Sequence, residues 1–177
     1  MTKHCADIQS DRELGAYWER EFCKLAARHG LVFTPIQIGL SKSAQAWSLR
    51  ENKWKNYTLP DITVWTAPGQ HHEIKHKCPT RYGSFGLESY RFEHLIEFAH
   101  ITQQDVLYTI HNHALNGGRH NKTNDIRHWL TANVMELDGK WTVSGTHSSS
   151  YYANGVTTPQ IYYWPVSLWM PLLEYWQ

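Results

Sequence analysis

The sequence predicts an α/β fold in which helices pack on a mixed β-sheet. A helical pattern is followed by three strand patterns, a second helical pattern and a further strand pattern, which gives the order αβββαβ. Of the 177 residues, 41% are hydrophobic and 19% are charged, so the chain can form a core and does not have a disordered composition. No linker marks a boundary, so residues 1–177 are expected to form a single domain.

The first two elements follow from side-chain periodicity. A helix is expected at 11–29, because Trp18 and Phe22 recur there at helical spacing and Gly30 follows as a stop signal. Residues 31–40 alternate and are rich in β-branched and aromatic side chains, so a strand is expected there.

A hairpin is expected in the middle of the chain. Residues 41–58 have no sustained period and are expected to form a long loop or a broken helix. The segments 59–65 and 71–77 are expected to be the two strands of the hairpin, because Pro68 and Gly69 between them suit a tight turn.

The remaining elements complete the predicted order. A loop at 78–86 leads to a helix at about 87–100, and 105–112 is expected to be a strand. The segment 124–136 is ambiguous, and we favour a helix. The tail is expected to contain two short strands and a final short helix, at 140–145, 159–165 and 167–176.

The composition excludes several classes of protein. The 17 Lys and Arg residues against 16 Asp and Glu residues give a net charge of +1, which excludes a generic polyanion binder. The apolar runs are too short to span a membrane, and the polar N-terminus has no signal-peptide core. Three scattered cysteines argue against a disulfide framework. We expect a cytoplasmic protein and guess a bacterial or phage origin.

Three ionisable side chains are expected to converge on one face of the central hairpin. Glu73 and Lys75 share a strand face because alternate residues point the same way, and the turn brings Asp61 alongside them. Two carboxylates that lie close together repel each other unless a cation separates them, and oxygen ligands suit Mg²⁺ or Mn²⁺. Lys75 beside such a site could hold a water molecule or help to deprotonate it.

The pattern resembles the PD-(D/E)XK nuclease superfamily, also called restriction-endonuclease-like. Pro60-Asp61 and Glu73-Ile74-Lys75 match its motif, and an acidic residue stands on the upstream helix. The resemblance spans about 11–112 and implies a restriction-endonuclease-like αβββαβ core with a mixed sheet flanked by helices. Residues 113–177 would then be an aromatic-rich C-terminal extension.

This resemblance implies a metal-dependent DNA endonuclease that hydrolyses phosphodiester bonds with Mg²⁺ or Mn²⁺. It implies Asp61 and Glu73 as metal ligands together with the carbonyl of Ile74. It also implies Lys75 as the catalytic lysine and Glu19 as a supporting acid.

Holliday-junction resolvases look like the nearest branch, given the small size and the helix-strand-hairpin start. That branch uses a serine after the first strand, which could be Ser41 or Ser43, and the acid on the helix could be Glu19 or Glu21. A homodimer is expected, because cutting both strands usually needs two active sites.

A DNA-binding surface must be local, because the net charge is close to zero. Local basic strips would form a rim around the acidic site, where phosphate contacts give affinity. Trp47 and Trp54 lie among the basic residues of the segment 41–58 and could stack on unpaired bases. Tyr90 and Arg91 on the second helix could reach the cleft. The predicted nucleic-acid contacts are Lys42, Arg50, Lys53, Lys55, Lys77, Arg81, Arg119 and Lys122.

Two other functions remain open. The chain could be a non-catalytic nucleic-acid-binding protein of nuclease fold. It could also be a zinc-binding module, because His111 and His113 alternate on one strand face and could bind zinc with His120 or His128.

Overall fold

The computed structural model describes residues 5–36, 43–48, 53–66, 69–143 and 160–177. The first half of the chain contains α1 (Cys5–Arg28), β1 (Val32–Pro35), β2 (Ser43–Ser48), β3 (Lys53–Thr58), β4 (Ile62–Trp65), β5 (Gln70–Lys77) and β6 (Ser84–Glu88). The second half contains α2 (Ser89–Thr102), β7 (Asp105–Asn112), the 3₁₀ helix η1 (Ile126–His128), β8 (Trp129–Asn133), α3 (Val134–Leu137), β9 (Thr142–Val143), β10 (Ile161–Pro165), the 3₁₀ helix η2 (Val166–Leu168), β11 (Met170–Pro171) and α4 (Leu172–Tyr175).

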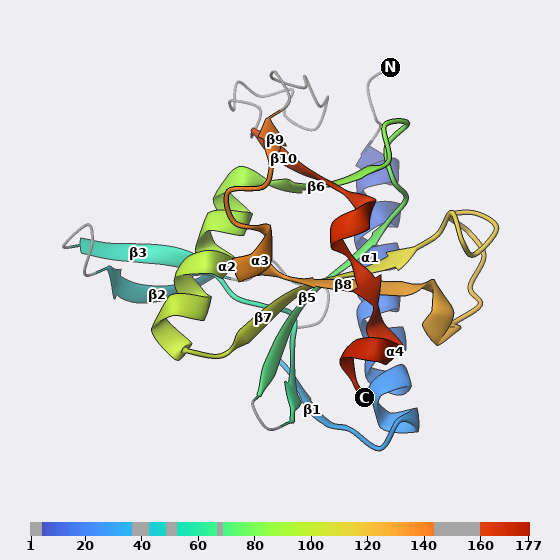
Figure 1. Cartoon of the computed structure of the whole chain (residues 1–177), viewed down its shortest axis with the longest axis horizontal. Coiled ribbons are helices and arrows are strands. Elements are labelled where there is room, and N and C mark those ends of the chain that lie inside the picture. Colours follow the sequence, from blue (N-terminus) through green and yellow to red (C-terminus); the bar gives the residue numbers. More distant parts are fainter. Residues whose placement is uncertain (1–4, 37–42, 49–52, 67–68, 144–159) are drawn as a thin grey trace.

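A six-stranded mixed sheet forms the centre of the fold, in the order β1-β4-β5-β7-β8-β11 (Figure 1). β5 pairs antiparallel with β4 and parallel with β7. Parallel neighbours need a crossover connection, and α2 lies in the connection between β5 and β7. The predicted α/β class is confirmed, with helices on both faces of a mixed sheet. The predicted αβββαβ order is that of α1, the main-sheet strands β1, β4 and β5, α2 and β7.

The predicted C-terminal extension contributes strands to this same sheet. β8 pairs antiparallel with β7, and β11 pairs with β8 at the edge. A second sheet of three strands, in the order β6-β10-β9, joins the tail to the segment between β5 and α2.

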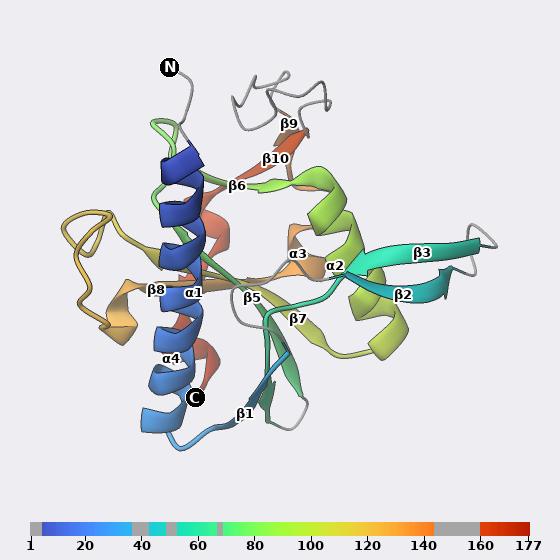
Figure 2. The same ribbon diagram turned by 180° about the vertical axis from the view of Figure 1, so that it is seen from behind.

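Several element predictions were wrong. The segment 41–58 contains a β-hairpin of β2 and β3 in place of a loop or broken helix, and it projects from the body beside α2 (Figure 2). The expected loop at 78–86 contains the start of β6, and the expected helix at 124–136 is η1, β8 and α3. The final segment 167–176 holds only one turn of helix, after part of η2 and β11.

The error at 124–136 has a physical cause. Trp129, Thr131 and Ala132 of β8 are all buried, because β8 lies between β7 and β11 and is covered on both faces. A short apolar run that is buried on both faces has no alternating pattern, so it cannot be told from a buried helix by periodicity.

Two hydrophobic clusters cover the two faces of the main sheet. On one face, α1 packs Trp18 and Phe22 against Ile74 and Trp129.

α1 has 24 residues, but no helix in the described part of the chain is long and apolar enough to cross a membrane.

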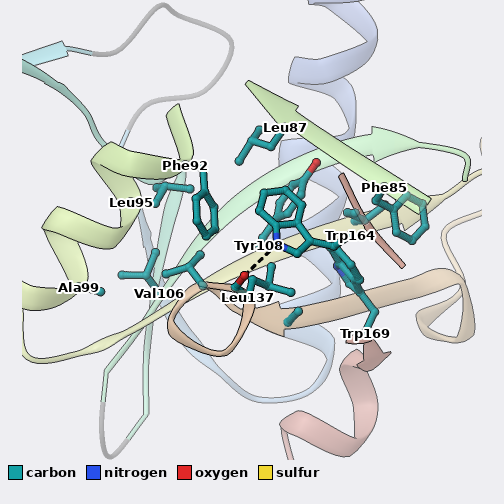
Figure 3. Close-up of a cluster of buried hydrophobic side chains, with 13 residues drawn as sticks. Phe85, Leu87, Phe92, Leu95, Ala99, Val106, Tyr108, Leu137, Trp164 and Trp169 are labelled. Atoms are coloured by element: carbon teal, nitrogen blue, oxygen red, sulfur yellow. Dashed lines mark hydrogen bonds between the residues drawn. The ribbon is translucent and has the colours of Figure 1, made fainter. Parts of the chain in front are cut away.

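The second face is covered by α2 and by the three-stranded sheet. Phe92 of α2, Tyr108 of β7 and Trp164 of β10 belong to this cluster (Figure 3). The Trp164 indole N–H donates to the Leu137 carbonyl at 2.9 Å, so the ring is buried without an unpaired donor (Figure 3). Most of the tryptophans with described side chains therefore belong to the core.

A stack of rings joins α1 to the sheet. Trp18 stacks on His111 and His76, with ring centroids 3.5 and 4.9 Å away, and the Nδ1 atoms of the two histidines are 3.1 Å apart. Burial, together with the charges of neighbouring histidines, lowers the pKa of His76 to about 4 and that of His111 to about 3. Both rings are therefore neutral near pH 7, and their hydrogen bond needs one ring to donate and the other to accept.

This stack predicts that the protein loses stability in mild acid. In the unfolded chain these histidines bind protons at about pH 6.5, whereas in the folded chain they bind them only at lower pH. The free energy of unfolding should therefore fall as the pH decreases from about 6.5 towards 4. Each histidine contributes at most about 1.4 kcal/mol per pH unit, and the partly exposed His76 contributes less. Urea unfolding of a His111→Phe variant, which keeps the ring stack, should show a smaller slope with pH than the wild type. His100→Gln, at an exposed position of α2, should leave the slope unchanged. Stability that rises in mild acid would contradict this role.

Candidate functional site

The two faces of β5 carry different chemistry. The side chain of Ile74 belongs to the cluster under α1, while Glu73 points to the opposite face, where it meets Arg91 of α2. Strand alternation places Lys75 and Lys77 on the same face as Glu73. The chemistry therefore lies on the α2 side of the sheet.

Asp61 is fixed at the start of β4 by two hydrogen bonds to β5. Its backbone N–H donates to the His72 carbonyl at 2.8 Å, and its carboxylate Oδ2 accepts the Ile74 N–H at 2.6 Å. Both bonds cross the hairpin, and the carboxylate cannot turn away without leaving the buried Ile74 N–H without its partner.

Lys75 connects the two carboxylates. Its Nζ lies 3.9 Å from Asp61 Oδ2, forms an ion pair with Glu73 Oε1 and donates to the Ile74 carbonyl at 3.1 Å. The structure thus brings Asp61, Glu73, Lys75 and the Ile74 carbonyl together.

Arg91 adds a second cation that contacts Glu73. Its Nε lies 2.6 Å from Glu73 Oε1, and the Glu73 side chain is fully buried. Burial by itself lowers the pKa of Arg91, but the negative charges of Glu73, Asp61 and Glu88 outweigh it and raise the pKa above its usual value. The sequence placed Arg91 near the cleft but gave no partner for it.

Glu88, at the N-terminus of α2, is a residue that the sequence analysis missed. Burial raises its pKa, but the positive charges of Lys77, Lys75 and Arg91 prevail and lower it. The sequence did contain a signal for this residue, because Glu88 stands three residues before Arg91 at the start of a predicted helix, a spacing at which the two side chains can interact. With Asp61 and Glu73, it completes a cluster of three carboxylates and three cations.

Lys77 has a different environment from Lys75. Its ammonium donates to the Gly86 carbonyl of β6. Burial lowers its pKa to about 8, and the nearby charges of Lys75 and Arg91 act in the same direction, against those of Glu88 and Glu73. It is therefore a positioned cation at neutral pH that loses its charge more easily than an exposed lysine.

Two carboxylate oxygens of the cluster are placed to meet a bound cation. Glu73 Oε2 and Glu88 Oε2 are both buried and have no hydrogen-bond partner in the described structure, whereas Glu73 Oε1 faces Lys75 and Arg91. Mg²⁺ is usually held by one or two carboxylates, with water and phosphate completing its shell, so Asp61, Glu73 and the Ile74 carbonyl form a suitable set.

The structure gives no comparable support for zinc. Among the described residues, no group of three or more His, Cys, Asp or Glu side chains is arranged to hold a metal ion, so zinc has no set of three such ligands and the set at Asp61 and Glu73 is limited to two carboxylates. His111 instead bonds to His76 and stacks on Trp18.

The two candidate acids on α1 differ in their surroundings. Glu21 is buried, lies 2.6 Å from the Lys24 ammonium and accepts a hydrogen bond from the Asn124 amide at 3.0 Å. It anchors α1 to the segment before β8, which is a structural role. Glu19 is half-buried. Burial of the Cys23 thiol, and to a lesser extent the negative charge of Glu19, raises the pKa of that thiol to about 11. Because α1 covers the face opposite Glu73, the catalytic role of Glu19 remains a prediction.

The predicted nucleic-acid contacts divide into separate groups. Lys42, Arg50 and the alternative Ser41 lie outside the described residues. Lys53 and Lys55 lie on β3, the strand of the projecting hairpin that ends at Thr58, three residues before Asp61 (Figures 1 and 2). Ser43 is the first residue of β2.

A second group lies near the N-terminal half of α1. Arg119 forms an ion pair with Asp11, and the Lys122 ammonium lies 5.1 Å from the centre of the Tyr17 ring. Arg81 is exposed in the loop between β5 and β6. These cations remain predicted contacts.

Comparisons with known proteins find solved structures that resemble this chain. One of them is Hjc of Archaeoglobus fulgidus, a Holliday junction resolvase from an archaeal hyperthermophile. The identity is 12% and the TM-score is 0.49, over 89% of this chain and 99% of that chain. No protein-family model and no curated protein sequence matches the chain. A similarity at this level assigns neither family nor activity.

The pairing of Arg91 with Glu73 predicts a measurable coupling. Arg91→Met should lower the free energy of unfolding by about 3 kcal/mol, because it leaves a buried carboxylate with one cation fewer. The double variant, Arg91→Met with Glu73→Gln, should lose less free energy of unfolding than the sum of the losses of the two single variants. Urea unfolding in the presence of EDTA measures both effects. Arg20→Met, at an exposed position of α1, should change stability by less than about 0.5 kcal/mol. Additive losses would show that Arg91 and Glu73 do not interact.

Proposed function

We propose that this chain is a metal-dependent DNA endonuclease of the PD-(D/E)XK superfamily, which hydrolyses phosphodiester bonds with Mg²⁺ or Mn²⁺. The observation that carries the proposal is the convergence of Asp61, Glu73 and Lys75 across one hairpin. The Ile74 N–H holds one carboxylate, and the other has an unpartnered buried oxygen. An ordinary surface ion pair does not need this arrangement.

Each residue of the cluster has a distinct part in the proposed reaction. Asp61, Glu73 and the Ile74 carbonyl would hold the cation, which would lower the pKa of a bound water and stabilise negative charge on the phosphate. Lys75 lies between the two carboxylates and would orient the attacking water or take its proton. Arg91 would hold Glu73 in place. Glu19, on α1 and outside this cluster, is carried over from the sequence resemblance as a supporting acid.

The charge of the cluster agrees with a phosphodiester substrate. The carboxylates of Asp61, Glu73 and Glu88 balance the cations Lys75, Lys77 and Arg91. A bound divalent cation would make the site positive, and a positive site attracts a phosphate.

The proposal also covers the substrate and the assembly. The motif suggests branched DNA such as a Holliday junction, cut by a cytoplasmic homodimer with two active sites. A non-catalytic nucleic-acid-binding protein of the same fold is the alternative. An assay for cleavage separates the two, because a binding protein would retain DNA affinity without cutting any strand.

Cleavage should require a divalent cation. Mg²⁺ or Mn²⁺ should support cutting of labelled DNA, and EDTA should abolish it, because two carboxylates alone provide no electrophile. Ca²⁺ should support binding with little cutting, since it tolerates looser geometry and activates water less. Mn²⁺ should also raise the melting temperature of the wild type in the absence of DNA, and Glu73→Gln should remove that shift. Full activity in EDTA would refute the mechanism.

Two lysines on one strand face provide the sharpest test of the reaction. Lys75→Ala should reduce the single-turnover cleavage rate on the order of 10²- to 10⁴-fold, the range for a lost proton-transfer group, with little change in DNA affinity. Lys77→Ala should mainly weaken binding, because Lys77 lies two residues farther along β5 than Lys75 and its ammonium is held by the Gly86 carbonyl. Dissociation constants measured with the rates separate the two effects. A wild-type rate for Lys75→Ala would show that the motif is not catalytic.

A further inference from the structure

A pocket of about 520 Å³ opens at the carboxyl end of β5, next to the candidate catalytic cluster. Its walls come from β5, β6, β10 and the loop after β7. The lining residues that matter for its chemistry are Lys77, Ser84, Gly86, His113, Arg119 and Tyr163.

The pocket continues directly from the catalytic strand. Lys77 follows Lys75 on the same face, and the strand rise places it about 6 to 7 Å farther along. A nucleic-acid strand whose phosphate lay at Lys75 would therefore bring a neighbouring nucleotide to this pocket.

Gly86 shapes one wall of the pocket. β6 and β10 pair Gly86 with Tyr163, and a Cβ at Gly86 would lie 2.7 Å from Tyr163 Cε1. Only glycine lets the tyrosine ring lie this close to β6 without displacement. Its carbonyl accepts hydrogen bonds from Lys77 and from the Tyr108 hydroxyl, so the same residue also positions the cation.

The lining chemistry matches one nucleotide. Lys77 supplies positive charge for a phosphate, Arg119 adds a guanidinium that is already paired with Asp11, and Ser84 supplies a hydroxyl. Tyr163 and His113 supply rings on which a base can stack. Burial lowers the pKa of His113, and the charge of Arg119 lowers it further, so this ring is neutral and suited to stacking near pH 7.

We propose that this pocket holds one unpaired nucleotide of the substrate strand, beside the phosphodiester that is cut. The inference rests on the proposed nuclease function and specifies its substrate class: DNA with an unpaired nucleotide next to the cleavage site. The volume falls in the range of small-ligand sites. A base that is paired within a duplex cannot enter a concave pocket without leaving its stack.

The test compares three labelled duplexes that differ at one position. One is fully paired, one has a single unpaired nucleotide next to the cut, and one has an abasic unpaired residue there. In Ca²⁺, the unpaired nucleotide should tighten binding on the order of 10-fold, as for one stacked base, and removal of its base should abolish the gain. Equal dissociation constants for all three duplexes would overturn the proposal.

Matched variants assign the effect to the pocket. Tyr163→Ala should remove the preference for the unpaired nucleotide, and Tyr163→Phe should retain it. Trp65→Ala changes an exposed aromatic residue at the far end of β4 and should retain the preference. A preference that survives Tyr163→Ala in a folded variant would place the unpaired nucleotide elsewhere.

A charge-matched pair guards against misfolding at the tyrosine. Arg119 and Arg127 are both exposed arginines that pair with an aspartate, but only Arg119 lines the pocket. Arg119→Gln should weaken binding of the unpaired duplex, and Arg127→Gln should not. Equal effects of the two changes would contradict the proposal.

The same experiments separate this inference from the nuclease proposal. If the wild type cuts no substrate in Mg²⁺, the nuclease function fails, while the dissociation constants still test the pocket. If cleavage occurs without preference for the unpaired duplex, the nuclease function stands and the pocket proposal fails. Competition by free deoxynucleoside monophosphate as strong as that by the unpaired strand would assign the pocket to a free nucleotide and overturn the substrate claim.

Discussion

The hydrogen bond from the Ile74 N–H to the Asp61 carboxylate is the contact on which the candidate site depends. It is 2.6 Å long and joins the residue that precedes β4 to the centre of β5. With Asp61 fixed, Lys75 lies between two carboxylates, and Arg91 approaches Glu73 from α2. An isolated buried charge is very costly, so these groups can be buried only together.

Hydrophobic packing on the two faces of the sheet sets the geometry of this charged cluster. α2 is held by Phe92 and Leu95 in the second hydrophobic cluster, and this places Arg91 over β5. On the other face, Trp18 holds α1 against His76 and His111, which remain neutral because desolvation and the charges of neighbouring histidines lower the pKa of each ring. The site therefore combines one apolar and one charged face of a single strand.

The C-terminal part of the chain completes both the sheet and the surroundings of the site. β8 and β11 extend the main sheet, and β10 pairs with β6 next to Lys77. Tyr163 thereby reaches a pocket whose other walls are more than 40 residues earlier in the sequence. Gly86 is needed at this junction, because any side chain there would meet the tyrosine ring.

The sequence by itself determined the features that depend on local periodicity. The alternation of Glu73, Ile74 and Lys75 predicted which side chains share a face, and the tight turn predicted that Asp61 would lie beside them. Tertiary structure decided the remainder: β8 is a strand because β7 and β11 flank it, and Arg91 meets Glu73 because α2 packs across β5. These contacts join segments that are distant in the sequence, and local pattern carries no information about which distant partner will supply a hydrogen bond, a charge or a buried surface.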